Sequence, residues 1–268
     1  MEPMDFRDRW LLVTGASSGL GREMAKNLAT VHGANLIVVA RRQDRLDSLK
    51  AEITELCSAQ VVSVRADLSR LEDTDRVLAE AARHPLYGAI LNAGVTHFGL
   101  HADLSWDAFR QMLDTNVTSV VRMTNALLPL LELTNGGLML VASMAGVLPV
   151  PYQTAYSATK AFLVHFGCGL FHEYKGRSVS ITTYTPGGVV SEMTDGEKFT
   201  LLRRWLMPTD LAAQEGVNAL RLRKYLYVPG AANRVASAFV RLLPRQYATG
   251  ILGDQYRKAL RKSNAEDR

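Results

Sequence analysis

Residues 14–21 read TGASSGLG, directly after the apolar run WLLV at 10–13 and at the start of a helical pattern. Three glycines, Gly15, Gly19 and Gly21, give this stretch the spacing G-x3-G-x-G. Glycines permit positive φ and let the backbone approach a pyrophosphate, and a helix N-terminus adds free N–H groups and a partial positive charge. This order of strand, glycine-rich turn and helix predicts a dinucleotide-binding site; the alternative is a plain tight turn.

Outward from this turn, apolar runs alternate with helical patterns along most of the chain. Strands that are apolar nearly throughout indicate a parallel sheet covered by helices on both faces. Right-handed crossovers then give a doubly wound, Rossmann-like α/β sheet of about seven strands. The predicted strands are 10–13, 35–40, 61–64, 87–91, 137–142, 179–184 and 225–228, and the predicted helices are 19–31, 44–57, 71–83, 106–131 and 154–174.

The length of the chain sets the expected domain organisation. An α/β chain of 268 residues commonly forms one domain, so we expect a single dinucleotide-binding domain over residues 1–268. Within it, a substrate lid is expected at 187–208, after the sixth strand. A basic helical extension is expected at 231–268, where the alternation of strands and helices ends.

Composition narrows the class of protein. Hydrophobic residues at 47% and charged residues at 21% fit a soluble globular protein. No run reaches the ~18 apolar residues of a membrane span, and the charged N-terminal residues contain no signal-peptide core. Cys57 and Cys168 lie far apart in the sequence, which favours free thiols in a reducing compartment and a cytoplasmic protein. The net charge of +5 leaves anionic ligands and membrane surfaces open, but no motif for binding nucleic acid is present.

The end of the second predicted strand bears on the cofactor. An acidic residue there would bond the ribose 2′-hydroxyl of NAD, whereas an arginine accommodates the 2′-phosphate of NADP. The sequence has Ala40-Arg41-Arg42 and no acid at this point. Guanidinium groups suit phosphates through paired N–H donors. The pattern favours NADP(H) over NAD(H); the alternative is that both arginines form the solvated start of a helix.

Tyr156 and Lys160, in YSATK, stand four residues apart and share one helix face. A free tyrosine has a pKa of ~10, and a nearby ammonium lowers it by stabilising the phenolate, which makes a better acid or base near neutrality. Ser143 ends the fifth predicted strand, at the edge where open α/β sheets bind ligands. Its hydroxyl could hold a substrate oxygen beside Tyr156. Taken singly, each feature also fits an ordinary helix pair or a strand-end serine.

Together these motifs resemble the short, single-domain type of the short-chain dehydrogenase/reductase family. The resemblance covers roughly Arg9 to Met193 and follows the order of motifs in the family. The matching pieces are TGASSGLG at 14–21, Asp67 in ADL, Asn92-Ala93-Gly94, Asn116 in NVTS, Ser143, YSATK at 156–160 and Pro186-Gly187.

The resemblance implies an NAD(P)(H)-dependent oxidoreductase, most simply an NADPH-dependent reductase of a carbonyl compound. It implies Tyr156 as general acid and base, Ser143 as the group that orients the substrate oxygen, and Lys160 as the residue that lowers the tyrosine pKa and binds ribose. Asn116 would complete the catalytic set by holding a proton-relay water through its backbone. The implied cofactor contacts are Gly15, Ser17, Ser18, Gly19, Leu20, Gly21, Arg41, Arg42, Asp67, Leu68, Asn92, Ala93, Gly94, Tyr156, Lys160, Pro186, Gly187, Val189 and Ser191.

The expected substrate side is rich in apolar residues. This favours a small apolar carbonyl or alcohol substrate, such as an acyl chain, a steroid-like ring or an aromatic ketone; the alternative is that the same side chains fill the core or a subunit contact. Arg203 and Arg204 could meet an anionic head group, or remain solvated. The apolar residues are Met193, Phe199, Leu201, Leu202, Trp205, Leu206 and Met207 in the lid, and Val147, Leu148, Val150 and Tyr152 in the loop after Ser143.

His97 and His101 stand at a four-residue interval, which is a metal-ligand spacing on a helix. No third ligand is evident in the sequence, and the chemistry implied by the resemblance needs no metal. We therefore expect no metal site, and either histidine could edge the substrate pocket.

Two segments predict contacts outside the domain. The helix 154–171 is apolar on nearly every side, so we expect one face on the sheet and the other in a homodimer or homotetramer. An apolar stripe in the basic tail could pack on its own domain or on a partner subunit, or it could lie on a membrane surface. The stripe comprises Ala232, Val235, Ala236, Phe239, Val240 and Leu243, flanked by Arg234, Arg241 and Arg245.

Two other functions stay open beside the reductase. A dinucleotide-binding scaffold or sensor would keep the fold and lack catalysis, but the intact set of Ser143, Tyr156 and Lys160 argues against it. A membrane-associated lipid reductase would share the chemistry and use the basic tail at 231–268 to reach the membrane.

Overall fold

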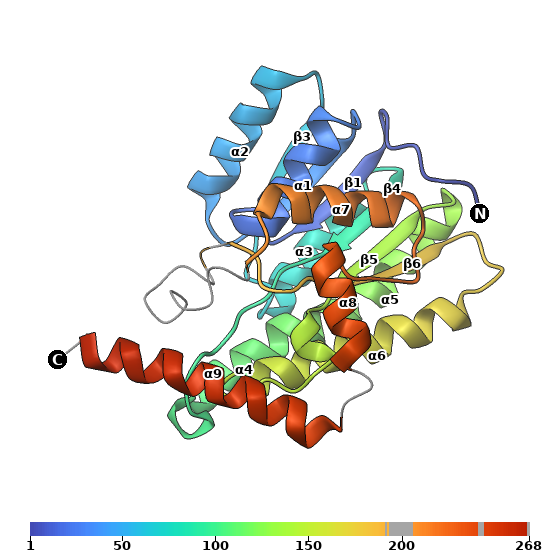
Figure 1. The fold of residues 1–268 in the computed structure, drawn as a ribbon. Coiled ribbons are helices and arrows are strands. Elements are labelled where there is room, and N and C mark those ends of the chain that lie inside the picture. The colour runs from blue at the N-terminus through green and yellow to red at the C-terminus, as the bar shows by residue number, and fades with distance from the viewer. Residues whose placement is uncertain (191, 193–205, 241–243, 267–268) are drawn as a thin grey trace.

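The computed structural model describes residues 1–190, 192, 206–240 and 244–266, and these contain one seven-stranded sheet (Figure 1). All neighbouring strands are parallel, in the order β3-β2-β1-β4-β5-β6-β7. This arrangement confirms the predicted doubly wound α/β fold. The strands are β1 (Trp10–Thr14), β2 (Asn35–Ala40), β3 (Val61–Arg65), β4 (Leu86–Leu91), β5 (Gly137–Val141), β6 (Ser180–Tyr184) and β7 (Leu226–Tyr227).

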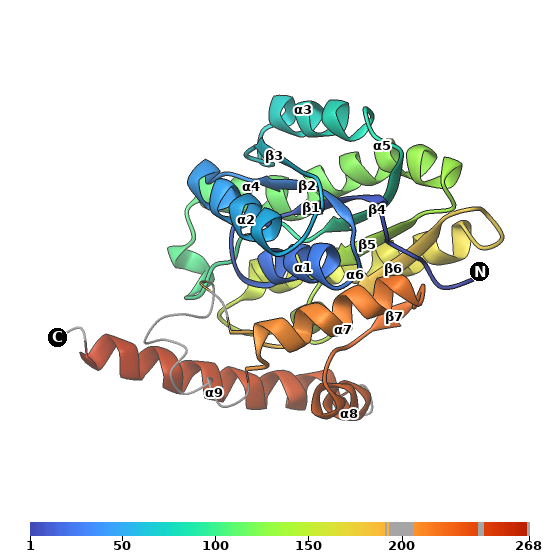
Figure 2. The same cartoon turned by 90° about the horizontal axis from the view of Figure 1, so that it is seen from above.

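Helices cover both faces of the sheet, and the view from above separates the layers (Figure 2). The helices of one face share a core with one set of strand side chains, and the helices of the other face share a second core. The first face carries α1 (Gly19–Thr30), α2 (Gln43–Leu56) and α7 (Thr209–Arg221), and the second carries α3 (Leu71–Ala81), α5 (Ser119–Leu133) and α6 (Thr154–Glu173).

The strands are apolar nearly throughout because each one contributes to both cores. In β1, Leu11 and Val13 belong to the core beneath α1 and α7, whereas Leu12 belongs to the core beneath α5 and α6. All three side chains are fully buried. Since successive side chains of a strand point to opposite faces, a sheet covered on both sides leaves no position for a polar face.

The predicted helix 106–131 is interrupted in the structure. α4 (Trp106–Leu113) leads into a π-helical turn, η2 (Asp114–Thr118), before α5 begins at Ser119. The wide turn buries Thr115 and Asn116. Such π-turns inside helices are frequent at functional sites, and here the turn sets the position of a predicted catalytic residue.

Beyond β7, the chain forms α8 (Ala231–Val240) and the longer α9 (Arg245–Glu266), which both views show at the periphery of the sheet. α9 contacts the loops that follow β4 and β5. Its Tyr256 ring lies 5.4 Å from the ring of Phe98, and Arg257 Nε donates to the hydroxyl of Tyr152 at 3.2 Å. Within the described residues, every helix is too short or too polar to cross a bilayer.

Candidate active site

A cavity of about 1010 Å³ opens at the carboxyl ends of the strands, where doubly wound sheets bind their ligands. It joins the glycine-rich turn after β1 to the loops after β2, β3, β4, β5 and β6, and α8 and α9 close its far side. The predicted site residues that line it are Gly15, Ser17, Ser18, Gly19, Leu20, Arg41, Arg42, Asp67, Leu68, Asn92, Ala93, Gly94, Ser143, Tyr156, Lys160, Pro186, Gly187 and Val189.

The glycine-rich turn is shaped by close backbone packing. Gly15 has φ of 70° and Gly19 has φ of 53°, which side-chain-bearing residues rarely adopt. Gly21 has another role: it does not line the cavity, and a Cβ there would lie 2.4 Å from both Gly15 O and Asn92 Nδ2. Gly21 therefore lets α1 approach the turn, and the cofactor contact that we expected for it stays a prediction.

The loop after β4 is fastened to this turn. Asn92 Nδ2 donates to the carbonyl of Thr14 at 3.0 Å, and the backbone N–H groups of Asn92 and Ala93 donate to Thr14 Oγ1 at 3.0 and 3.1 Å. Gly94 faces the catalytic side, because a Cβ there would be 3.3 Å from Asn116 Oδ1 and 3.5 Å from Lys160 Nζ. These bonds hold the two central loops of the cavity in one fixed arrangement.

Arg42 stands at the end of β2 with its guanidinium turned back over the glycine-rich turn. Its Nη2 donates to Ser18 Oγ at 3.0 Å and to Ser17 Oγ at 3.3 Å. It also pairs with Glu192 at 2.8 Å, an ion pair in which both side chains are about half exposed. The pKa of the Glu192 carboxyl is lowered, chiefly by its hydrogen bond with Arg42. The sequence predicted the cation at this corner and missed the carboxylate.

Asp67 and Leu68 line the cavity on the side of β3, where the resemblance places the adenine. Asp67 Oδ1 accepts from Ser69 Oγ at 2.8 Å and from the Ser69 backbone N–H at 3.1 Å. The Asp67 backbone N–H donates to Asp73 Oδ2 at 2.7 Å. The Asp67 side chain thus orders its own loop, and Leu68 adds an apolar surface that is 7% exposed.

Asn116 is fully buried in the π-turn and does not line the cavity. Its Oδ1 accepts from the Val95 N–H at 2.8 Å, and its Nδ2 donates to the Val95 carbonyl at 2.9 Å and to Thr159 Oγ1 at 3.1 Å. The amide joins the loop after β4 to α6. The side chain is thereby used for positioning, which leaves its predicted backbone role in a proton relay as a prediction.

Ser143, Tyr156 and Lys160 converge on the cavity although they come from a loop and two turns of α6. Ser143 hydrogen-bonds Tyr156 through its side chain. Lys160 Nζ lies 5.8 Å from the centroid of the Tyr156 ring and donates to the Val141 carbonyl at 2.9 Å. Ser143 Oγ also accepts from the Ala145 N–H at 3.1 Å, which fixes its rotamer. The three side chains that the sequence predicted to act together are therefore neighbours in space.

Burial controls the protonation of this set. Burial raises the pKa of Tyr156, while its hydrogen bond with Ser143 acts in the opposite direction. Burial lowers the pKa of Lys160 to about 8. The lowering of the tyrosine pKa that we expected from Lys160 does not dominate here, because the ammonium is directed at the Val141 carbonyl. Tyr156 is consequently held as a neutral phenol, ready to donate a proton.

The loop after β6 supplies the wall beside the expected nicotinamide. Pro186, Gly187 and Val189 line the cavity, and Val189 forms a parallel β-bridge with Met207. Leu206 also lines the cavity. Several predicted residues lie outside the described part of the chain: Ser191, Met193, Phe199, Leu201, Leu202, Arg203, Arg204 and Trp205.

The C-terminal helices form a wall that the sequence did not assign to the site. Of the expected apolar stripe, Val235 and Phe239 do not pack on the domain, since they are 70% and 62% exposed, and Arg241 and Leu243 lie outside the described residues. The residues of α8 and α9 that line the cavity are Asn233, Ala236, Ser237, Ala248, Ile251, Leu252, Gln255 and Tyr256. No motif marks them, because their place follows only from how the two helices fold back on the sheet.

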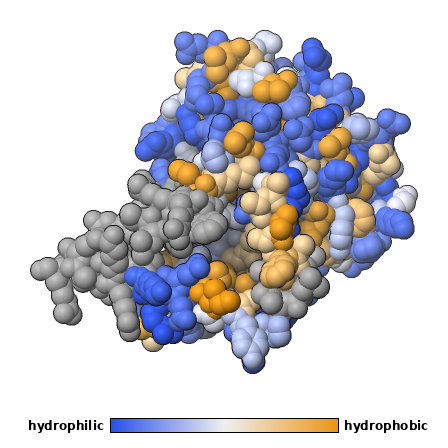
Figure 3. All heavy atoms as spheres, viewed as in Figure 1, coloured by the Kyte–Doolittle hydropathy of each residue, from blue (hydrophilic) through white to orange (hydrophobic). Residues whose placement is uncertain are grey.

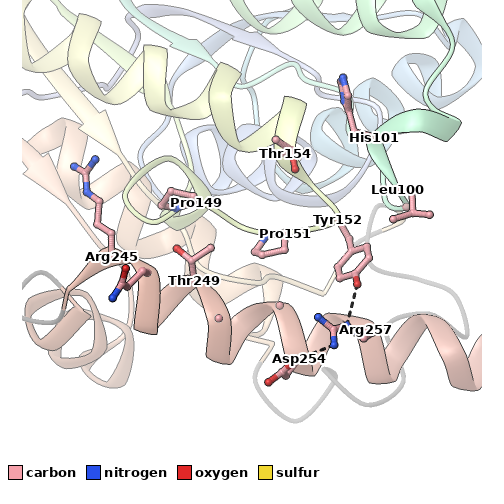
Figure 4. A pocket seen from close by; sticks show the side chains of 14 residues that line it. Leu100, His101, Pro149, Pro151, Tyr152, Thr154, Arg245, Thr249, Asp254 and Arg257 are labelled. Carbon is pink, nitrogen blue, oxygen red and sulfur yellow. Dashed lines mark hydrogen bonds and ion pairs between the residues drawn. The ribbon is translucent and has the colours of Figure 1, made fainter.

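A second, smaller cavity of about 750 Å³ lies between α9 and the loops at 99–101 and 149–154 (Figure 4). Tyr152, which we expected on the substrate wall, lines this cavity and bonds Arg257. His97 and His101 form no metal cluster, and no group of three potential metal-ligating side chains occurs among the described residues. Cys57 and Cys168 are half-buried free thiols, as expected.

A doubly wound sheet that gathers a serine, a tyrosine and a lysine beside a glycine-rich turn is the arrangement that the resemblance to short-chain dehydrogenases predicts. A family model described as short chain dehydrogenase matches residues 9–200. The chain belongs to the short-chain dehydrogenase family, which confirms the resemblance seen in its motifs.

Two curated relatives and one solved structure illustrate this kinship. The 11-beta-hydroxysteroid dehydrogenase 1A of Arabidopsis thaliana is 37% identical over 194 residues, 71% of this chain and 55% of that protein. The very-long-chain 3-oxoacyl-CoA reductase-A of Danio rerio is 31% identical over 198 residues, 72% of this chain and 62% of that protein. A short-chain dehydrogenase from Sphingobium yanoikuyae in complex with NADPH is 25% identical, with a TM-score of 0.78 over 87% of this chain and 93% of that chain. The chain thus spans little more than half the length of the curated relatives.

Proposed function

We propose that this protein is an NADPH-dependent reductase of an apolar carbonyl compound. The observation that carries the proposal is the meeting of Ser143, Tyr156 and Lys160 in the same cavity as the glycine-rich turn. A purely structural serine, tyrosine or lysine would have no reason to face a cavity that also contains a nucleotide-binding turn. The meeting of all three argues against the silent scaffold or sensor.

The cavity fits a dinucleotide at its phosphate end. A Cβ at Gly15 would come within 2.8 Å of Asn92 Nδ2 and 2.9 Å of Ala93 Cα, so the turn tolerates no side chain and brings backbone close to the cavity. The N-terminus of α1 opens there, which suits an anion. Gly15, Ser17, Ser18 and Gly19 would hold the phosphates, and Lys160 would bind the nicotinamide ribose.

The two arginines at the end of β2 support NADP(H) over NAD(H). Arg41 and Arg42 line the cavity, and no acid stands beside them at the end of the strand. The Arg42 guanidinium is 42% exposed, so it is accessible to a phosphate that displaces the Glu192 carboxylate. The NADPH bound by the relative from Sphingobium yanoikuyae is consistent with this preference.

The proposed reduction uses the chain's own donors at the carbonyl oxygen. NADPH, when bound, supplies the hydride that the carbonyl carbon receives. Ser143 holds the oxygen, and Tyr156 transfers its proton to it as negative charge develops there. Lys160, whose pKa of about 8 leaves it largely charged at neutral pH, places a cation near the tyrosinate that forms. Asn116 fixes the loop and helix that carry these groups.

The lining of the cavity supports an apolar substrate. Val147, Leu148 and Val150 contribute from the loop after β5, and Ile251 and Leu252 contribute from α9. Apolar surface of this kind favours substrates that bury hydrocarbon on binding. Steroid and long-chain acyl compounds, named for the two curated relatives, are suitable classes to test.

The exposed face of α6 supports a homodimer or homotetramer that forms through this helix. One side of α6 carries Leu163, Gly167 and Leu170 into the domain. The opposite side, which we expected to meet a second subunit, leaves Phe162 42% exposed. The exposed positions are Thr154, Ala158, Phe162, His165, Gly169, His172 and Glu173. Because most of them are small or apolar, a second subunit is the partner that fits them.

The membrane-associated reductase remains a second candidate because α8 and α9 expose large apolar side chains. Val235, Phe239, Tyr247 and Ile251 are each about 60–70% exposed. Figure 3 shows apolar residues gathered around a hollow in the lower part of the molecule. Basic residues near such a surface favour anionic lipid. Sedimentation with anionic vesicles tests this candidate, and a protein that stays in solution at low salt would exclude it.

A direct assay tests the reductase. We expect the absorbance of NADPH to fall steadily when the protein is mixed with a panel of steroid, 3-oxoacyl and aromatic ketones. NADH should support a slower reaction at the same concentration. Tight binding of NADPH without turnover on any ketone or, in reverse, any alcohol would favour the scaffold or sensor instead.

A further inference from the structure

The cavity contains a second phenol, from Tyr256 on α9, in addition to Tyr156. α9 is held against the substrate loops by contacts on either side of this residue. Arg257 donates to the Tyr152 hydroxyl, and Pro151 lies against Gly253, where a Cβ would come within 3.2 Å (Figure 4). The Tyr256 ring itself packs 5.4 Å from the ring of Phe98. These contacts fix where the phenol stands.

The hydroxyl of Tyr256 has no hydrogen-bond partner among the residues that the structure describes, whereas Tyr152, Tyr184 and Tyr227 each have one. Burial raises the pKa of Tyr256, so the group is a neutral donor at physiological pH. A negative charge on Tyr256 would raise the pKa of Tyr156, which shows that the two phenols share one part of the cavity.

The side chains that line the cavity beside Tyr256 do not supply this bond. Ala248 and Leu252 on α9 and Leu148 in the loop after β5 have no polar side-chain atom, and Gln255, which also lines the cavity, forms no hydrogen bond with Tyr256 in the described part of the chain. A hydroxyl that loses water among such side chains is costly to leave unpaired. A ligand that fills the cavity with hydrocarbon alone would therefore bind less well than one that offers this hydroxyl an oxygen.

We propose that Tyr256 is a specificity-determining residue that hydrogen-bonds a second oxygen of the substrate. This inference rests on the proposed reductase function and narrows its substrate class. The preferred substrates are apolar compounds with a carbonyl or hydroxyl oxygen in addition to the one that reacts. A site built to pair with such an oxygen discriminates against analogues that lack it.

Tyr256→Phe tests the inference, because the phenylalanine keeps the ring contact with Phe98 and removes only the hydroxyl. Ketones are assayed with NADPH in matched pairs: a 3-oxo ester against a simple ketone of equal length, and a steroid diketone against the corresponding monoketone. We expect the variant to lose about 3- to 10-fold in kcat/KM on the doubly oxygenated member, mainly through KM, and to change little on the other.

Tyr247→Phe is the matched control, since Tyr247 is on the same helix, is 62% exposed and does not line the cavity. It should leave both members of each pair unchanged. Equal losses on both members in Tyr256→Phe, or no loss on either, would overturn the inference while the reductase function stands. A wild-type protein that reduces no ketone at all would overturn the proposed function and this inference with it.

Discussion

The nucleotide end and the substrate end of the cavity are built in different ways. The turn after β1 and the ends of β2 and β4 are short local motifs whose residues bond one another, as Asn92 does with Thr14. The wall formed by α8 and α9 comes from more than 130 residues further along the chain and meets the same cavity through side chains with no common pattern. The first end is constrained by backbone geometry, and the second by packing alone.

The two ends should therefore differ in how many substitutions they tolerate without loss of function. A turn in which an added Cβ would meet backbone atoms tolerates few substitutions. A wall made mostly of exposed or half-buried helix residues tolerates more substitutions, and it can be altered to accept another substrate. The catalytic set lies between the two ends, so removing the proton donor Tyr156 should affect turnover more than the binding of either ligand.

The largest expected effect is on the chemical step and not on the binding of nucleotide or substrate. Tyr156→Phe removes the proton donor, which is worth typically 10²–10⁴-fold in turnover. The phenyl ring preserves the packing of α6, so affinity for NADPH should stay within a few-fold of wild type. Steady-state rates and fluorescence titration with NADPH measure the two quantities. A variant with near-normal turnover would mean that another group donates the proton.

Lys160→Met is expected to lower turnover and to raise the stability of the fold. The ammonium is only 4% exposed, and its pKa falls from 10.5 to about 8 because burial disfavours the charged form. Removing it should raise the free energy of unfolding at pH 7 by up to about 3 kcal/mol while turnover falls. Urea denaturation of both proteins measures the difference.

The pH dependence of that difference has a definite sign. Between pH 8 and 10.5 the unfolded chain binds a proton that the folded wild type has released, so wild-type stability gains with rising pH in this window. The advantage of Lys160→Met should therefore shrink from pH 8 upward. A constant advantage would show that the apolar packing of the methionine, and not the removal of the buried charge, causes it.

The same contrast explains how far the sequence could predict the structure. The positions of the strands along the chain and the residues of the glycine-rich turn were predictable, because they depend on apolar periodicity and on glycine at fixed spacing. The convergence of Ser143, Tyr156 and Lys160 followed from the register of strand ends and one helix face. The π-turn at Asn116 was missed because π-helical and α-helical turns share the same sequence pattern.

Longer-range contacts account for the remaining differences. Glu192 and Tyr256 were missed because each meets the site through contacts with residues more than 140 positions away. The apolar stripe left its own domain, a partner subunit and a membrane surface open as partners, and in the structure Val235 and Phe239 are exposed while Ser237 is buried. Hydrophobic spacing identifies which face of a helix is apolar, but it does not say what covers that face.

Gly21→Ala probes the rigidity of the nucleotide end. The new Cβ would lie 2.4 Å from the Gly15 carbonyl oxygen, so α1 or the turn must shift. We expect a loss of about 1–3 kcal/mol in stability and weaker NADPH binding, even though alanine favours a helix.

Gly250→Ala in α9 is the counterpart, because nothing lies within 4 Å of its Cβ position. That variant should gain up to about 1 kcal/mol and bind NADPH normally. Similar behaviour of the two variants would remove the contrast between the two ends.

The smallest expected effect concerns the one ion pair at the nucleotide corner that the sequence did not predict. Glu192 occupies the Arg42 guanidinium at 2.8 Å, where the 2′-phosphate of NADP would bind, so the two anions compete for one cation. Glu192→Gln should therefore tighten binding of 2′,5′-ADP by about 2- to 5-fold, a modest change because the pair is exposed to solvent. Binding of 5′-ADP, which lacks the 2′-phosphate, should not change.

Glu132→Gln provides the control for net charge, because Glu132 pairs with Arg177 in a partly exposed ion pair near the C-terminal end of α5 and neither residue lines the cavity. Calorimetric titration at low and high salt should show the gain for Glu192→Gln shrinking as salt screens the competition. An equal gain in affinity for 2′,5′-ADP and 5′-ADP would mean that the effect comes from the change in net charge alone. Weaker binding of 5′-ADP would mean that Glu192 accepts a hydrogen bond from the ribose, in which case this carboxylate replaces the acid missing from the end of β2 and the preference for NADP(H) fails.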